Sequence, residues 1–554
     1  ELDLSNFDTS SVTSMDSLFA QSFNLSSINV SSFNTSKTTN MSCMFYGCSK
    51  LGDIDLSNFD TSKVTNMWQM FGSCRALTSL DLSGFDTSAV TNMSRMFFSD
   101  SALQTIYAST KWSTDNATNS TQMFYGCSKL KGDIDFNPLY LDKTYAKIDG
   151  GYLTSIYTME SYEGWYKGTV AKKTITKITF MENYTPSSPV DEMWNADVRD
   201  KGTIKVYRTG TELIIAPNGG GKIKANANSQ AMFGSTVFTM NVKEINNLNL
   251  VDMRYVTNAL FMFQNCRNLA SLDLSEVHFD NLLYMWSMFH ECRSLTSLDL
   301  SEFNTSKVTA MNYIFYDCMS LTDLNISGFD TSKVTSMQAM FYGCTELANL
   351  DVTKFDTSNV TDMFRMFSYC RNLTELNLSN FNTNKVKYMN EMFKGCISLE
   401  SLDLRNFDTS SVVEMGGMFK YCEKLKQLDL TNFNTSSVTS MFYKGANDNS
   451  GMFEGCASLQ ELDLSSFDTG KVTDMQRMFY GCKALRTIYV SDKWATDNVT
   501  ASGFMFWNCA ALKGDIAYAD TSSDKTYATA VGGYLTMKKQ SSEQISFTIE
   551  GVTY

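Results

Sequence analysis

Hydrophobic and polar positions recur along this chain with a period of 26 residues. The clearest unit spans residues 298–324 and reads LDLSEFNTSKVTAMNYIFYDCMSLTDL. Counted from its first leucine, copies begin at Leu272, Leu298, Leu324, Leu350, Leu376, Leu402 and Leu428. A fixed period of this size predicts an array of stacked structural repeats.

Each unit changes its hydrophobic period once. Leu298 and Leu300 alternate with polar residues, which predicts a short strand with one buried face. After a polar turn the apolar steps become 3, 3, 1 and 3, the spacing expected on one face of a short helix. These later apolar positions are Val308, Met311, Ile314, Phe315 and Cys318. The pattern predicts an α/β repeat solenoid with one short strand and one short helix in every rung.

The repeats fall into two blocks, which predicts two solenoids in tandem with a small β-rich cap between them. Two similar segments, 106–154 and 488–536, each end in DKTY followed by GGYLT and lie 382 residues apart, so both are interpreted as C-terminal caps. The predicted order is a C-terminal part of a first solenoid at 1–154, a connector at 155–172, a β-rich N-terminal cap at 173–247, a second solenoid at 248–487, its cap at 488–536, and the start of a further domain or a tail at 537–554.

Thirteen of the 14 cysteines occupy the same position of the repeat, and only Cys43 lies outside this row. A ladder of disulfides or metal ligands is one interpretation of such a row, and a row of small buried side chains is the other. No C-x-x-C spacing occurs, and Ser22 and Asp100 take the position in two repeats. We therefore expect buried free thiols, and no metal or other cofactor.

The formal net charge of −13 argues against nucleic acid as a partner, because no basic field exists to displace phosphate counterions. No run of about 20 apolar residues appears, so no membrane span is expected. The only two histidines, His278 and His290, have no cluster of carboxylates or thiols at ligand spacing. No catalytic motif is found, so the chain is expected not to be an enzyme.

The motif L-x-x-L-D-L-S-x-F-D-T-S-x-V-T-x-M-x-x-M-F-x-x-C resembles the repeat of BspA-like leucine-rich-repeat surface proteins. Clear copies are LTSLDLSGFDTSAVTNMSRMF at 77–97 and LTDLNISGFDTSKVTSMQAMF at 321–341. The same repeat is similar to one found in mycoplasma lipoproteins. The resemblance implies a bacterial, extracellular, cell-surface protein of the adhesion or host-interaction kind, and it implies no catalytic residues.

The residue between the two strand leucines points away from the core once per rung. In the second block this row contains Asp273, Asp299, Asp351, Asp403, Asp429, Asp463 and Tyr489, with Asn325 and Asn377 between them. A row of serines and threonines runs beside it. The row is either a recognition surface, as solenoids use their extended faces, or a solvated face whose side chains bond to the adjacent backbone.

Two further binding hypotheses concern single places in the second block. Eight extra residues, 443–450, form a loop in the unit that begins at Leu428, and Tyr443, Lys444, Asn447, Asp448 and Asn449 are candidate contact residues because insertions in repeat arrays map to loops. The three successive carboxylates of Asp403, Asp429 and Asp463 are expected to raise one another's pKa. They would attract a basic partner or, less favoured, a divalent cation.

The sequence therefore predicts a non-catalytic, monomeric surface protein that binds a host or matrix protein or glycan through its extended face, its loops or both. Two alternatives stay open. One is a passive stalk that presents another domain, and the other is a carbohydrate-active enzyme, for which no acid/base pair stands out.

Overall fold

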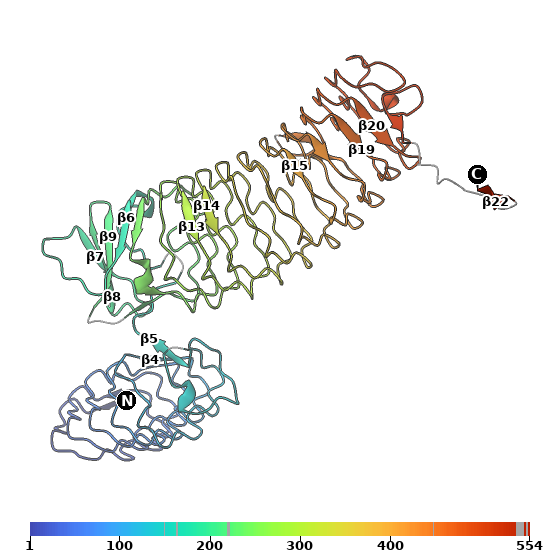
Figure 1. Cartoon of the computed structure of the whole chain (residues 1–554). Coiled ribbons are helices and arrows are strands. Elements are labelled where there is room, and N and C mark those ends of the chain that lie inside the picture. The colour runs from blue at the N-terminus through green and yellow to red at the C-terminus, as the bar shows by residue number, and fades with distance from the viewer. Residues whose placement is uncertain are drawn as a thin grey trace.

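The computed structural model describes residues 1–148, 150–161, 164–218, 222–446 and 448–538, together with the backbone of two short strands near the C-terminus. Two stacks of rungs follow each other along the chain, with a β-sheet module between them (Figure 1). The described ranges contain no α-helix, and their ordered elements are short β-strands and four 3-10 helices.

The elements follow the chain in this order. The first stack contains β1 (Leu2–Asp3), β2 (Ile28–Asn29), β3 (Ser79–Asp81), β4 (Thr105–Ala108), η1 (Lys143–Tyr145) and β5 (Leu153–Ser155). The module contains η2 (Lys172–Thr174), β6 (Lys177–Phe180), β7 (Glu192–Asn195), β8 (Ile204–Thr209), β9 (Glu212–Pro217), β10 (Ile223–Lys224) and β11 (Glu244–Asn246). The second stack contains η3 (Leu248–Leu250), β12 (Val251–Asp252), β13 (Ser297–Asp299), β14 (Asp323–Asn325), β15 (Ser401–Leu402), β16 (Gln427–Leu428), β17 (Phe442–Lys444), β18 (Asn449–Gly451), β19 (Glu461–Asp463), β20 (Thr487–Val490), η4 (Lys525–Tyr527) and β21 (Thr536–Met537). Beyond it, β22 (Thr548–Ile549) pairs with β23 (Val552–Thr553); the rest of the predicted tail, 539–547, 550–551 and 554, lies outside the described residues.

Neighbouring rungs pair in parallel through their strands, one repeat apart. β13 pairs with β14 so that Leu298 lies opposite Leu324, and β15 pairs with β16 in the same way. In the module, a five-stranded sheet has the order β11-β6-β9-β8-β7. The strand half of the repeat pattern is thus seen in the structure as short strands, each covering two to four residues.

The second half of each rung is not a helix, so the predicted α/β class is wrong. Between Met41 and Cys48 the N–H groups of alternate residues bond to the next rung, as from Met41 to the carbonyl of Asn66 at 2.9 Å and from Phe45 to that of Met70 at 2.9 Å. The residues between them bond three positions back within the rung, as from Cys48 to Phe45 at 3.1 Å. This chain of overlapping turns, here called the ribbon, satisfies its backbone groups partly in the neighbouring rung, whereas an α-helix satisfies them within itself.

Left-handed residues four positions apart give the ribbon its path. Cys43 and Gly47 have φ values of 54° and 77°, and the pair recurs in later rungs, for example at Ala339 and Gly343. A positive φ at the third residue is what a type II turn requires, and it interrupts a right-handed helix. The side chains at steps 3, 1 and 3 still point inward, because a four-residue turn repeat and an α-helix place them on the same side. The hydrophobic spacing therefore fits both structures.

The core consists of rows of identical side chains stacked along each array. One phenylalanine per rung forms a continuous ladder, with ring centroids 5.6 Å apart for Phe315 and Phe341 and 5.7 Å for Phe341 and Phe367. All 14 cysteines are buried and free, which confirms the predicted burial. Each thiol of the row donates to a carbonyl of the preceding rung, as from Cys370 to Phe341 at 3.2 Å, and burial raises the pKa of the Cys370 thiol well above its usual value.

A buried threonine row, which the sequence analysis did not single out, joins the turns that follow the strands. Thr331 is 1% exposed, and its hydroxyl donates to the carbonyl of Asp356 in the next rung at 2.9 Å. Thr357 repeats the contact to Asn382 at 2.9 Å, and it also accepts the Asn382 N–H at 2.8 Å. Each of these threonine hydroxyls therefore links one rung to the next by a buried hydrogen bond.

The module lies against the C-terminal end of the first stack, and two basic side chains make the contact. The Arg199 guanidinium pairs with Asp81 and lies 4.8 Å from the centroid of the Tyr107 ring. The Lys224 ammonium pairs with Asp133, and both side chains are only 8% exposed. The two stacks nevertheless have separate buried cores, one from Met15 to Leu153 and the other from Ile156 to Leu535.

Candidate functional site

The strand side of the second stack, here called the strand face, carries the predicted row of acidic residues. Each aspartate of this row accepts a hydrogen bond from the backbone N–H two residues later: Asp299 from Ser301 at 2.9 Å and Asp351 from Thr353 at 2.9 Å. Asn325 accepts the same bond from Ser327 at 3.1 Å. Such Asx turns end the strand and begin the turn. The row therefore has a local structural role, and the bond uses one side-chain oxygen of each residue.

The remaining predicted members of the row lie on the same face. Asp273, Asp403, Asp429 and Asp463 make the same backbone bond at 3.1, 3.1, 3.0 and 3.0 Å. Tyr489 is half-buried in β20, opposite Asp463 of β19.

The predicted rise in the pKa values of Asp403, Asp429 and Asp463 is outweighed by other contacts: Asp463 does raise the pKa of Asp429, but the pKa of each of the three is lowered. Hydrogen bonds from the Arg405 side chain and backbone lower the pKa of Asp403 to about 2. The Thr431 hydroxyl and backbone N–H lower that of Asp429. Burial raises the pKa of Asp463, but hydrogen bonds from Lys538 and Ser465 outweigh it and lower the pKa. Each carboxylate is thus stabilised by its own partner.

These pairings also bear on the cation hypothesis. The Arg405 guanidinium donates hydrogen bonds to both carboxylate oxygens of Asp403, at 2.9 and 2.7 Å, and Lys538 pairs with Asp463. In the part of the chain that the structure describes, no group of three or more histidine, cysteine, aspartate and glutamate side chains could hold a metal ion. His278 lies 3.8 Å from Glu302, whereas His290 is half-buried and stacks on Tyr316 at 4.6 Å. The divalent-cation alternative therefore finds no support in the geometry.

Charge divides the strand face into two halves. Each rung contributes to this face one six-residue segment around its two strand leucines, here called a strand segment. The five strand segments between residues 270 and 379 contain no lysine or arginine. Their acidic residues are all exposed: Asp273, Asp299, Asp323, Asp351 and Glu375. We call this part the acidic half. From residue 400 to residue 491 the same segments carry Arg405, Lys426 and Arg486.

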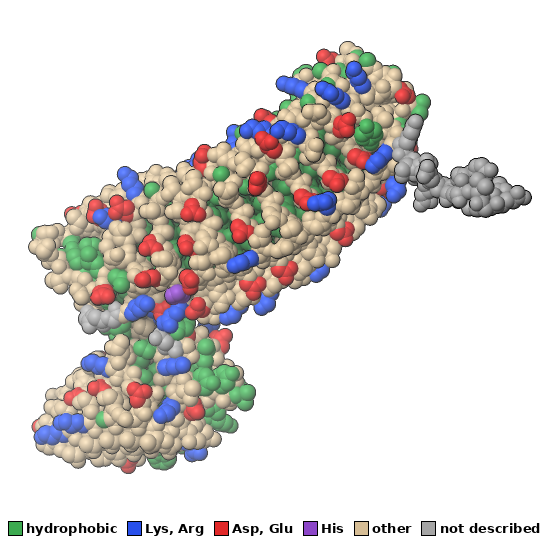
Figure 2. Space-filling view, in the orientation of Figure 1, with side chains coloured by type: hydrophobic (Ala, Val, Ile, Leu, Met, Phe, Trp, Pro, Cys, Tyr) green, Lys and Arg blue, Asp and Glu red, His purple; other side chains and the backbone are tan. Residues whose placement is uncertain are grey.

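The acidic half is also hollowed. A hollow of about 650 Å³ is lined by residues of three successive rungs, among them Asp273, Asp299 and Asp323. The outer strand leucines form its floor, and Leu272 is 7% exposed. Figure 2 shows a line of hydrophobic side chains sunk between acidic ones along the second stack, with more basic side chains toward its C-terminal end. The face can therefore offer carboxylates, hydroxyls and some apolar surface to an extended ligand.

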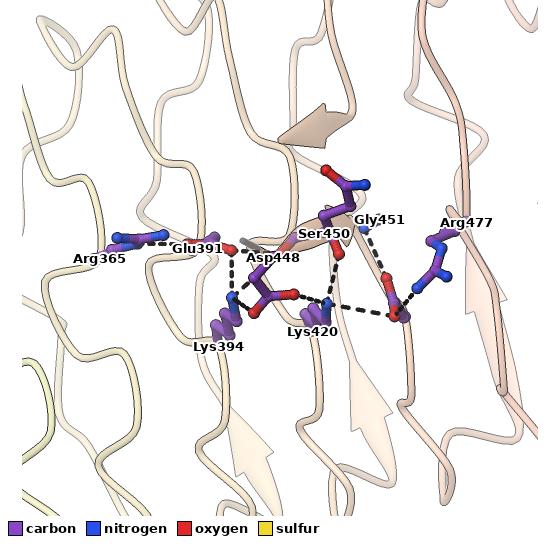
Figure 3. A network of polar contacts seen from close by, with 10 residues as sticks. Arg365, Glu391, Lys394, Lys420, Asp448, Ser450, Gly451 and Arg477 are labelled. Carbon is purple, nitrogen blue, oxygen red and sulfur yellow. Dashed lines mark hydrogen bonds and ion pairs between the residues drawn. The ribbon is translucent and has the colours of Figure 1, made fainter. Parts of the chain in front are cut away.

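The predicted binding loop is a β-hairpin of β17 and β18 that folds back over the ribbon side of earlier rungs. Tyr443 packs its ring 5.2 Å from that of Phe364 and lies 5.4 Å from the Arg365 guanidinium. Asp448 pairs with Lys394 at 2.6 Å and with Lys420 at 2.8 Å (Figure 3). The side chains of these two predicted contact residues therefore already have partners within the same chain.

Lys444 and Asn449 remain exposed in the hairpin. Asn447 lies outside the described residues.

Beneath the hairpin lies a buried ionic network that the sequence analysis missed. The Glu391 carboxylate is unexposed and binds Lys394 at 2.5 Å and Arg365 at 2.5 Å. Lys420 and Arg477 pair with the buried Glu454 at 3.4 and 3.1 Å (Figure 3). Burial alone would lower the pKa of Lys394, but hydrogen bonds to Asp448 and Glu391 outweigh it and raise the pKa.

A sequence signal for this network exists. Lys394, Lys420 and Glu454 each directly follow the ladder phenylalanine. Other rungs have no lysine, arginine, aspartate or glutamate at that position; examples are Tyr342 and Ser368. Charged residues that interrupt an uncharged row, beside an insertion, could have predicted ion pairs with the inserted loop.

No helix in the described ranges is long and apolar enough to cross a membrane.

A model of the family described as "Mycoplasma protein of unknown function, DUF285" matches residues 1–78, 53–137, 228–350, 340–449 and 444–543, which together make up most of the chain. This match agrees with the resemblance to mycoplasma repeats. Among solved structures, a leucine-rich cell surface protein from Faecalibacterium prausnitzii A2-165 is similar, with 17% identity and a TM-score of 0.29 over 68% of this chain and 94% of that one. The TLR13–ssRNA13 complex is similar with 13% identity and a TM-score of 0.16, over 86% of this chain and 76% of that one. At such scores neither structure carries an argument about ligands. No curated protein matches the chain.

Proposed function

The chain belongs to this DUF285 family, and from that premise we propose that it is a BspA-like, non-catalytic surface protein of a bacterium that binds a host or matrix macromolecule. The proposed site is the acidic half of the strand face, and the favoured ligand is an extended, positively charged segment of a protein. The proposed setting is extracellular, and the proposed active form is a monomer that needs no cofactor and binds no nucleic acid.

One observation carries this proposal: backbone bonds hold three carboxylates of the acidic half in place, and its strand segments contain no lysine or arginine. The nearest basic residue in the sequence is Lys354, which directly follows one strand segment and lowers the pKa of Asp351. Backbone bonds fix the side chains of Asp273, Asp299 and Asp351. Asp273 and Asp299 lie one rung apart, and Asp299 and Asp351 lie two rungs apart. Because their side chains are already ordered, a ligand would order fewer groups on binding. The spacing of neighbouring strands, about 4.8 Å, suits a partner that places successive cationic groups along the face.

The second half of the face supplies a matched control for the experiment. Asp273→Asn, Asp299→Asn and Asp351→Asn together remove charge while keeping the Asx turns, since Asn325 makes the same turn. The control variant changes Asp403, Asp429 and Asp463 to Asn, where Arg405 and Lys538 already pair with two of the three carboxylates. Binding of the full chain to cultured epithelial cells would be measured for both variants across a range of salt concentrations.

We expect the first variant to lose about tenfold or more in affinity together with the salt dependence of binding, and the control to lose much less. Trypsin treatment of the cells should abolish binding, whereas loss after glycosidase treatment alone would assign the ligand to glycans. Equal binding by both variants would contradict the proposed site. Absence of binding by the unmodified chain would favour a passive stalk, and turnover of cell-surface glycans would favour an enzyme.

A further inference from the structure

The two stacks end in caps of the same construction, at residues 106–155 and 488–537. In the first cap the N–H of Gly150 donates to Asp133 Oδ2 at 2.8 Å, and in the second that of Gly532 donates to Asp515 Oδ2 at 3.0 Å. In both caps a final strand pairs in parallel with the strand of the last rung, β5 with β4 and β21 with β20. Features of the first cap can therefore be compared position by position with the second.

At the end of the first stack, two positions of the cap and one position of the rung before it hold the module. Asp81 and Tyr107 receive the guanidinium of Arg199, and Asp133 receives the ammonium of Lys224. The Arg199 side chain retains only 8% of its exposure. A guanidinium over an aromatic face and beside a carboxylate is a favourable arrangement once water is excluded.

The module presents Arg199 from a rigid loop. The buried Asp197 carboxylate accepts four backbone N–H groups of this loop at 2.9–3.2 Å. These donors belong to Arg199, Lys201, Gly202 and Thr203. A loop closed around a buried carboxylate loses little freedom when it docks.

At the end of the second stack the same three positions recur, and no module lies over them in the part of the chain that the structure describes. Asp463, Tyr489 and Asp515 correspond to Asp81, Tyr107 and Asp133, each 382 residues later. A hollow of about 630 Å³ is lined by Asp463 and Tyr489 together with neighbours from two rungs and Lys538. The Asp515 residue is exposed, in contrast to the 8% exposure of the Asp133 side chain.

Two apolar side chains are also exposed at this end of the second stack. Val531, next to Gly532, is 87% exposed, and Met537 at the end of β21 is 50% exposed. The Lys538 side chain pairs with Asp463 and is 46% exposed. Asp463 therefore has a partly exposed ammonium as its partner, whereas Asp81 has the buried guanidinium of Arg199. Carboxylates and apolar side chains together suit a protein surface with complementary basic groups.

We propose that the C-terminal end of the second stack is a docking site for another β module of the kind formed by residues 156–246. The incoming module would place an arginine between Tyr489 and Asp463 and a lysine on Asp515, and would displace Lys538. This inference is independent of the proposed ligand site on the acidic half of the strand face. It assigns the cap a role in joining successive stacks end to end.

The module of the same chain does not supply this partner, because the first cap already holds its Arg199 and Lys224. A chain that lacks residues 1–155 would carry both a free module and a free second cap. Its core, from Ile156 to Leu535, contains no buried residue of the first stack. Such a contact joins unlike surfaces, so it would build head-to-tail oligomers.

The first test compares residues 156–554 with the full chain by analytical ultracentrifugation over a range of concentrations. We expect the shortened chain to form oligomers and the full chain to stay monomeric. Arg199→Ala, Asp515→Asn or Tyr489→Ala in the shortened chain should weaken association about tenfold or more, while Lys538→Ala should strengthen it. A cooperatively melting shortened chain that stays monomeric, or oligomers that ignore these substitutions, would overturn the proposal.

A second test needs no shortened chain. A labelled cyclic peptide with the sequence of residues 195–204, which carries Arg199, is titrated against the intact full chain. We expect saturable binding that Tyr489→Ala or Asp463→Asn abolishes and that Tyr107→Ala leaves in place. The peptide variant Arg199→Ala should not bind. Binding that survives Tyr489→Ala, or no binding by the unmodified peptide, would contradict the assigned arginine position.

Discussion

On the strand side, each rung bonds to the next through a short parallel ladder, and on the ribbon side through alternate N–H groups of a chain of turns. The strand side keeps its polar residues exposed and holds them with local backbone bonds, as at Asp299. On the ribbon side the regularly spaced apolar residues point inward, and the backbone needs residues with positive φ, such as Tyr313 and Asp317 of the same repeat. The difference teaches that the strand side tolerates a change of charge as long as the Asx turn is kept, whereas the ribbon side also constrains the backbone.

The largest effect is expected at the thiol row on the ribbon side. Cys370 is fully buried, so Cys370→Arg would place an unpaired charge among apolar side chains and cost more than about 4 kcal/mol of unfolding free energy. Cys370→Ala should cost only about 1 kcal/mol, because it leaves a small cavity. Urea unfolding of both variants measures the two values, and equal costs would show that the row is not packed tightly.

The hairpin network should come next. Lys394→Met leaves the buried Glu391 carboxylate without one of its partners and should lower stability by about 3 kcal/mol. Lys333→Met, at an exposed lysine in a nearby rung, serves as the control and should change stability by less than about 0.5 kcal/mol. Thermal melts of the two variants would contradict the role of the network if they shifted equally.

A third substitution separates the ribbon from a helix directly. Phe504 has a φ of 60° and is 55% exposed, so its replacement changes backbone preference more than packing. Phe504→Gly should be more stable than Phe504→Val by about 1–2 kcal/mol, because a β-branched residue is strained at positive φ. In an α-helix valine would be favoured over glycine. Chemical denaturation of both variants gives the order.

A pH-dependent effect is expected at Asp317 on the ribbon side. Burial raises the pKa of Asp317 to about 6, although Arg293 at 3.7 Å acts in the opposite direction. The folded protein therefore holds this proton between about pH 4 and pH 6 while the unfolded chain has lost it, so stability falls as pH rises through that window. Asp317→Asn should remove the fall and raise stability at pH 7.5, on the order of 1 kcal/mol after allowance for partial exposure. Melting curves at pH 4 and pH 7.5 test the sign; an increase that is equal at both pH values would contradict the assignment.

The smallest effect is expected on the strand side. Asp299→Asn should change stability by less than about 0.5 kcal/mol, because Asn325 makes the same backbone bond one rung later. Asp299→Leu removes the Asx turn and should be measurably worse. Similar melting temperatures for the leucine variant and the unmodified chain would show that the turn contributes little.

The sequence predicted the parts of the fold that depend on which side chains face inward. The 26-residue period places Leu298 opposite Leu324, and the buried position of Cys370 follows from its apolar neighbours. The helix prediction failed because inward positions at steps of 3, 1 and 3 suit both a helix and a series of four-residue turns. Gly47, Gly343 and Gly395, at one ribbon position in separate rungs, were a usable sign of left-handed backbone.

The candidate site was predictable as a location and less so as chemistry. The alternation around Asp273 correctly placed its side chain on the outer face. Two interpretations of this row stayed open: a recognition surface, or a solvated face whose side chains bond to the adjacent backbone. The hydrogen bond from the Ser275 N–H to Asp273 supports the second interpretation. The ion pairs of Asp448 with Lys394 and Lys420, which lie 54 and 28 residues earlier in the chain, were missed. The two lysines interrupt an otherwise uncharged row, and this was the sequence signal for the contact.

The threonine row has a mechanical consequence. Its hydrogen bonds, like those of the strands and the ribbon, join one rung to the next, so they lie along the long axis of the stack. A force that pulls the two ends apart would load these bonds one interface at a time. Each rung that peels away would release 26 residues, or roughly 90 Å of extended chain. A stack built in this way would lengthen stepwise under tension and absorb a sudden pull before the remaining rungs separate.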